Sequence, residues 1–87
     1  HKPDLETFRN LQLAYSAMEQ GGNQPCVLNA ANEVVVAAFL EDRVSFLGMS
    51  DVIEKTLSII GKQALSSLDD YLQCDQEARR VAQTFLQ

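Results

Sequence analysis

The chain has 87 residues, of which 46% are hydrophobic, and twelve acidic against seven basic residues give it a net charge of −5 at pH 7. This length allows one small domain with a single core and a thin margin of stability. The basic residues are scattered, with only Arg79 and Arg80 adjacent. They do not form the basic face that a nucleic acid or an anionic membrane requires, so we expect neither partner.

Membrane insertion and export are not expected either. The longest apolar stretch, residues 34–40, is far shorter than the roughly 20 residues of a membrane span. Charge and Pro3 come first in the chain and no apolar block follows, which is unlike a cleavable signal. Cys26 and Cys74 lie far apart in sequence and outside any Cys-x-x-Cys or Cys/His cluster, so we favour reduced thiols of a cytoplasmic protein over a disulfide or a zinc site.

The first predicted helix covers residues 5–20. Pro3-Asp4 is a typical start signal, and Gly21-Gly22 ends the segment. Its apolar residues recur at steps of three and four along one stripe: Phe8, Leu11, Tyr15 and Met18, widened by Leu13, Ala14 and Ala17.

The second predicted helix begins at Gln24 or Pro25 and ends near Glu41, with Pro25 in the first turn, where its missing N–H costs nothing. Apolar residues cover nearly its whole circumference, which predicts a central helix buried on most sides. The β-branched run of residues 34–36 would suit a strand, but the pattern is too long for one and the flanking alanines favour a helix.

The third predicted helix begins between Leu47 and Ser50 and ends near Ile60, before Gly61. Asp42-Arg43 should form a turn, and residues 44–47 a short extended connector with Phe46 tucked inward. The helix carries one apolar stripe: Met49, Val52, Ile53, Thr56, Leu57 and Ile60.

The last part of the chain predicts a linker over residues 62–66 and then a capping box at Ser67 to Asp70, which opens a short helix ending near Gln73. Asp75 is expected to cap a final helix over residues 76–85, with a kink or a break at Cys74-Asp75. The apolar face of that helix is Ala78, Val81, Ala82 and Phe85. The fold class is therefore all-α, a compact, bundle-like, four-helix domain that occupies residues 1–87 as a single unit.

An unusual polar cluster, Asn29, Asn32 and Glu33, lies in the middle of the most hydrophobic helix, on one face at steps of three and four. Such groups must be hydrogen-bonded or face something polar. We expect a structural polar cluster that satisfies loop backbone groups, for instance those of the Gly21–Asn23 turn. Contact with another domain and a ligand or metal site remain alternatives, although one carboxylate and two amides are few for a cation.

No other constellation predicts chemistry, so we expect no catalytic, cofactor-binding or metal-binding residue in this chain. The acidic pairs Asp69-Asp70 and Asp75/Glu77 stand at predicted helix starts, where capping explains them. An acyl-carrier reading of Ser66-Ser67-Leu68-Asp69 is disfavoured, because serine stands where that family has aspartate and the motif lies too near the C-terminus.

One string of residues resembles a known family. Leu13-Ala14-Tyr15, Gly21-Gly22, the segment from Pro25 to Val34 with its Leu-Asn-Ala-Ala-Asn-Glu core, and Ala37–Leu40 are similar to the C-terminal helical domain of 1-deoxy-D-xylulose 5-phosphate (DXP) reductoisomerase. Weaker similarity continues to Ala78-Arg79, so the resemblance covers essentially the whole chain. The family often has aspartate where Gly48 stands, which leaves the start of the third helix open.

The resemblance implies a parent enzyme of isoprenoid precursor biosynthesis, an NADPH-dependent oxidoreductase that converts DXP to 2-C-methyl-D-erythritol 4-phosphate with Mg²⁺ or Mn²⁺. It also implies that the nucleotide, metal and substrate sites lie on other domains. The expected partners are therefore the remaining domains of a parent homodimer, and the isolated domain is expected to be inactive, with self-association possible. The alternative is a free-standing helical interaction module.

Overall fold

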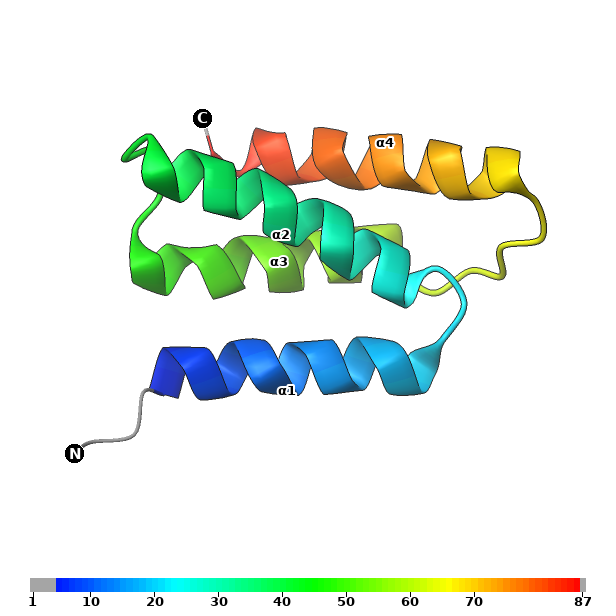
Figure 1. The fold of residues 1–87 in the computed structure, drawn as a ribbon, viewed down its shortest axis with the longest axis horizontal. Helices are drawn as coiled ribbons and strands as arrows, with labels where there is room; N and C mark the ends of the chain where they lie inside the picture. The colour runs from blue at the N-terminus through cyan, green and yellow to red at the C-terminus, as the bar shows by residue number, and fades with distance from the viewer. Residues whose placement is uncertain (1–4, 87) are drawn as a thin grey trace.

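The computed structural model of the chain describes residues 5–86, with side chains from residue 9 onward. This part folds into four helices and contains no strand (Figure 1). The helices are α1 (Leu5–Gln20), α2 (Gln24–Leu40), α3 (Phe46–Ile60) and α4 (Leu68–Thr84). The expected all-α, four-helix class is confirmed.

The second helix, α2, is the centre of the fold. It packs on α1, α3 and α4, whereas α1 reaches only α2 and α3 among the described residues. Figure 1 shows α1 and α3 running in one direction and α2 and α4 running back. The described part of the chain therefore has α1 at one side and α4 at the other, with α2 and α3 between them.

The core lies where α2, α3 and α4 meet. Small residues on the buried side of α2 allow close approach of its neighbours, and aliphatic side chains of α3 and α4 fill the remaining space. The fully or largely buried members are Val27, Ala30, Ala31, Val34, Val35, Ala38, Met49, Val52, Ile53, Ala78, Val81 and Ala82. The predicted stripe of α3 and most of the predicted face of α4 belong to this core.

Helix α1 has the predicted bounds, but among its described large apolar side chains only Leu13 packs against the core. Ala17 is buried, whereas Leu11, Tyr15 and Met18 are each more than half exposed. Ala17 and the partly buried Leu13 therefore lie on the side of α1 that packs on α2 and α3. Pro3-Asp4 and the side chain of Phe8 lie outside the described part.

The start of α3 corrects one prediction. Residues 44–47 were expected to be extended with Phe46 inward, but the helix already begins at Phe46. The cause is Ser45, whose hydroxyl accepts a hydrogen bond from the Gly48 N–H at 2.9 Å and caps the helix. Phe46 is consequently 42% exposed, with its ring edge-on to Phe39 at a centroid distance of 6.1 Å.

The structure of α4 corrects a second prediction. A separate short helix with a cap at Asp75 was expected, but α4 runs unbroken through Cys74-Asp75. Asp75 lies inside the helix and pairs with Arg79 four residues on, at 2.8 Å, which supports helix continuity. The capping box is confirmed, because Ser67 Oγ accepts from the Asp70 N–H at 3.1 Å.

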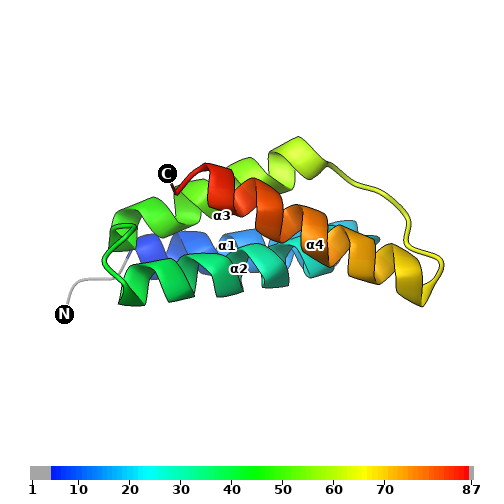
Figure 2. The ribbon, with the colours of Figure 1, turned by 90° about the horizontal axis from the view of Figure 1, so that it is seen from above.

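The linker over residues 61–67 spans the distance between the end of α3 and the start of α4. Figure 2 shows these two helix ends splayed apart at one end of the molecule, with the linker joining them. The cavity there, of about 540 Å³, is lined by α3, the linker and the first turns of α4.

Candidate functional site

The turn between α1 and α2 is held against the linker by two buried amide side chains. The Asn23 Nδ2 and Gln24 Nε2 groups both donate to the Gly61 carbonyl at 2.9 Å. Asn23 also exchanges two hydrogen bonds with the backbone of Gln63. Asn23 is completely buried, so this arrangement, the Asn23 clamp, fixes the linker to the start of α2.

The Gly21-Gly22 pair belongs to the same contact and is not a phosphate-binding loop. Both glycines have positive φ, at 69° and 57°. A Cβ on Gly22 would lie 2.5 Å from the Gln63 carbonyl oxygen, because the linker backbone is packed directly on this turn. The linker backbone therefore occupies the space beside Gly22, whereas Gly21 has open space.

The predicted polar cluster lies on the exposed side of α2. Asn29, Asn32 and Glu33 are all exposed, and they do not make the expected contact with the Gly21–Asn23 turn, which is bonded to Gly61 and Gln63 of the linker. The reason is position, since Asn29 already lies more than one helical turn beyond the loop. Asn29 Nδ2 instead donates to Glu33 Oε2 at 2.9 Å.

Glu33 extends this cluster to α4. Its carboxylate accepts from Arg79 at 3.2 Å, and Arg79 also pairs with Asp75 at 2.8 Å. Both carboxylates raise the pKa of Arg79, Asp75 most strongly. That Asn29, Asn32 and Glu33 act as a structural cluster remains a proposal, now as an exposed link between α2 and α4.

Several other acidic side chains are engaged by caps or arginines. Asp70 accepts from the Ser66 N–H and hydroxyl at 3.0 and 2.9 Å, and these bonds lower its pKa. Glu77 pairs with Arg80, which lowers the pKa of Glu77. Within residues 9–86 no group of three His, Cys, Asp or Glu side chains could hold a metal ion, so the side chains present do not fit a divalent cation.

The two cysteines lie close to each other on α2 and α4 as free, half-buried thiols. The Cys26 thiol donates to the Tyr71 carbonyl at 3.8 Å. Burial, followed by the neighbouring Cys74, raises the pKa of Cys26 to about 11. Cys26 is therefore protonated at neutral pH and is a poor nucleophile.

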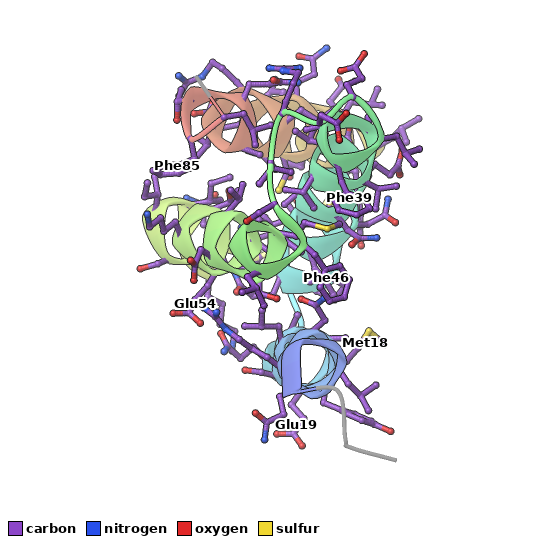
Figure 3. All side chains as sticks on the ribbon, turned by 90° about the vertical axis from the view of Figure 1, so that its left-hand side faces the viewer. Met18, Glu19, Phe39, Phe46, Glu54 and Phe85 are labelled. Atoms are coloured by element: carbon purple, nitrogen blue, oxygen red, sulfur yellow. The ribbon has the colours of Figure 1, made fainter. Side chains whose placement is uncertain are left out.

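A groove of about 360 Å³ lies between α1 and α2, and Ile53 of α3 also lines it. Figure 3 shows Met18, one of its lining residues, on the side of the molecule opposite Glu54 and Phe85. Met18 borders it from α1, and Leu28, Asn29 and Asn32 border it from α2. Beyond it, partly exposed apolar side chains continue along α2 to the start of α3. We call this surface the α1–α2 face; its members are Ala14, Met18, Pro25, Leu28, Asn29, Asn32, Val36, Phe39 and Phe46.

The sequence analysis missed the Asn23 clamp and the exposure of this face. Asn23 was treated as part of a glycine-rich turn, although an asparagine directly before a helix start is a recognised capping signal. Here it bonds a linker about 40 residues away instead of its own helix, and no local pattern encodes that partner. The stripe of α1 was found, but not the side to which it points.

No helix in the described part of the chain has the length and apolar character needed to cross a membrane.

A family model described as the DXP reductoisomerase C-terminal domain matches residues 1–81. A 1-deoxy-D-xylulose 5-phosphate reductoisomerase from Bacteroides thetaiotaomicron is 63% identical over 81 residues, which is 93% of this chain and 21% of the relative. The enzyme of that name from Methylococcus capsulatus is 45% identical over 85 residues, 98% of this chain and 22% of its own.

A solved structure agrees with the sequence comparisons. The 1-deoxy-D-xylulose 5-phosphate reductoisomerase from Zymomonas mobilis, in complex with NADPH, superposes with a TM-score of 0.89 at 41% identity. The match covers 100% of this chain and 23% of that one. The chain thus spans about a fifth of the length of the relatives it matches. With its four helices in the same arrangement and the family model over most of its length, the chain belongs to the DXP reductoisomerase family, in which it corresponds to the C-terminal domain.

Proposed function

We propose that this chain is the non-catalytic C-terminal domain of a DXP reductoisomerase and serves to pack against the rest of that enzyme. The whole protein would convert DXP to 2-C-methyl-D-erythritol 4-phosphate with NADPH and Mg²⁺ or Mn²⁺, as a cytoplasmic homodimer. The observation that carries the proposal is the full-length match to reductoisomerases of which the chain spans only about a fifth.

The polar groups of the domain support a structural role. The linker backbone packs on Gly22. The carboxylate of Asp70 accepts hydrogen bonds from Ser66, and that of Asp75 pairs with Arg79. A carboxyl group that acts as a general acid or base needs a pKa near the working pH, whereas the bonds from Ser66 lower the pKa of Asp70. These side chains stabilise helix ends and helix contacts, so the NADPH, metal and substrate sites are assigned to the other domains.

A complementation experiment tests this proposal. The Bacteroides thetaiotaomicron relative, shortened by the segment that matches this chain, is assayed for DXP-dependent NADPH oxidation alone and with the purified chain added. We expect no turnover by the chain alone and a gain of activity when the two parts are mixed. DXP-dependent NADPH oxidation by the pure chain would contradict the non-catalytic role, and failure of the two parts to associate would contradict packing.

A further inference from the structure

Three solvent-facing grooves of the described chain are candidate sites for contact with another protein surface. The cavity between α3, the linker and α4 is lined by Asp70 and Glu77, and a groove between α1 and α3 by Glu54 and Lys62. The groove of the α1–α2 face has no ionisable residue in its described lining. Because buried centres of protein interfaces are depleted of charge, this composition singles out the α1–α2 face.

The outward side of α2 has the pattern of a helix that is covered by protein. Pro25, Leu28, Asn32, Val36 and Phe39 follow one another at steps of three and four, along the whole helix. This stripe is distinct from the buried side that packs on α3 and α4. A helix that is apolar on nearly all sides requires cover on nearly all sides, and α1 shields only part of this one.

Side chains of α1 and α3 extend this stripe on both flanks. Met18, which lines the groove, is 67% exposed, and the exposed Tyr15 and Leu11 precede it at steps of three and four along α1. Figure 3 shows Met18 and Phe39 on the same side of the molecule, away from Glu54 and Phe85. Exposed aromatic, methionine and leucine side chains around uncharged amides are typical of a protein contact and not of a solvated surface.

We infer that the α1–α2 face is the surface on which the remaining domains of the same reductoisomerase polypeptide dock, with the Asn29 and Asn32 amides within the contact. This inference rests on the proposed function and names its surface. About four fifths of the relatives' length lies outside the matched segment. A covering surface in the same polypeptide is present at high effective concentration, which a second copy is not.

The amides explain how a mostly apolar contact is kept specific. Asn29 donates to Glu33 through Nδ2, so its side-chain oxygen is available to accept a hydrogen bond from a partner. Asn32 lies one turn further along on the same stripe. A partner that presents backbone or amide groups pairs with them, whereas a purely apolar surface would leave them unsatisfied.

The test measures the affinity of the chain for the shortened Bacteroides thetaiotaomicron relative by sedimentation velocity or calorimetry. The test variants are Met18→Lys on α1 and Val36→Lys on α2. The matched control is Ile59→Lys, which has a comparably exposed aliphatic side chain, at 60%, on the α3–α4 cavity. Leu72→Lys probes the exposed apolar start of α4. Circular dichroism and thermal melting show that each variant keeps the fold.

We expect Met18→Lys and Val36→Lys to weaken binding at least about tenfold, as for residues at the centre of an interface, and the two other variants to change it less than about threefold. If Val36→Lys does not fold, Met18→Lys alone decides. Binding that resists Met18→Lys, or that falls as much with Ile59→Lys or Leu72→Lys, overturns the assignment of the face but leaves the proposed function standing.

Two further outcomes concern the occupant. Absence of binding by the unsubstituted chain overturns the proposed function together with this inference. A chain that forms a dimer which Met18→Lys disrupts, without binding the shortened relative, shows that the face is covered by a second copy.

Discussion

Asn23 and Gln63 hold each other by a reciprocal pair of hydrogen bonds. The Asn23 N–H donates to the Gln63 carbonyl at 2.8 Å, and the Gln63 N–H donates to Asn23 Oδ1 at 2.8 Å. The two residues are 40 positions apart and join the α1–α2 turn to the linker before α4. The contact gives hydrogen-bond partners to backbone N–H and carbonyl groups of both loops. Without it, these groups would be packed together unpaired, at a cost in stability.

The first prediction concerns this clamp. Asn23→Ala removes the acceptor of Gln63 and a donor to Gly61, so we expect a loss of about 2–3 kcal/mol in the free energy of unfolding. Urea titration followed by circular dichroism measures it. Asn29→Ala is the control, because that side chain is exposed, and it should cost no more than about 0.5 kcal/mol. Equal effects of the two substitutions would mean that Asn23 does not hold the linker.

The two adjacent glycines should respond differently to alanine. Both have positive φ, which costs alanine about 1 kcal/mol, but only at Gly22 would the new Cβ meet a backbone atom, the Gln63 oxygen at 2.5 Å. Gly21 has open space. We expect Gly22→Ala to destabilise the domain by at least about 1 kcal/mol more than Gly21→Ala in the same urea titration. If the two variants unfold at the same denaturant concentration, the linker does not pack on the turn.

The expectation for Asn32 changes with the structure. If Asn32 satisfied buried loop backbone groups, as we expected from the sequence, Asn32→Leu would destabilise the domain by about 1–3 kcal/mol. Asn32 is exposed, so the stability of the isolated chain should change by no more than about 0.5 kcal/mol. Melting temperature measured by calorimetry decides, and a large decrease would show that the amide has a buried partner after all.

The raised pKa of Cys26 predicts slow alkylation. Thiol alkylation requires the thiolate, and with a pKa of about 11 this form is scarce at pH 8. Iodoacetamide should therefore modify Cys26 in the folded chain at least about tenfold more slowly than in the urea-unfolded chain. Mass spectrometry of the peptide that contains Cys26 measures both rates. Similar rates in the two states would contradict burial of this thiol.

The same group links stability to pH. The folded chain holds the Cys26 proton more tightly than the unfolded chain, in which the pKa is near the ordinary value of 9.0. Its contribution to stability is therefore complete below pH 9 and decreases as the pH rises from 9 towards 11. Cys26→Ala should flatten the pH dependence of the urea midpoint over that interval, while an unchanged slope would assign it to other groups.

The sequence by itself determined the helices and the family. Apolar spacing, the Gly21-Gly22 stop and the capping box at Ser67 are local signals, and each acts within about one helical turn of where it stands. They placed α1 at its observed bounds and found the core stripe of α3. They were wrong at Ser45, which caps α3 but was expected in an extended connector, and at Asp75, which lies inside α4 but was expected to cap a helix. Short polar side chains occur both as caps and within helices, so residue type alone does not decide between the two.

Only the tertiary structure decided which polar and apolar groups are buried. Leu11 and Met18 have the spacing of a core stripe but face solvent, and Asn23 is buried while Asn32 is exposed. Burial depends on what packs against a side chain, and the partner of Asn23 is a backbone segment 40 residues away that no local pattern specifies. The same distinction applies to the outward side of α1 and α2. The sequence showed that this side is apolar, and only the fold showed that its large side chains remain exposed in the described chain.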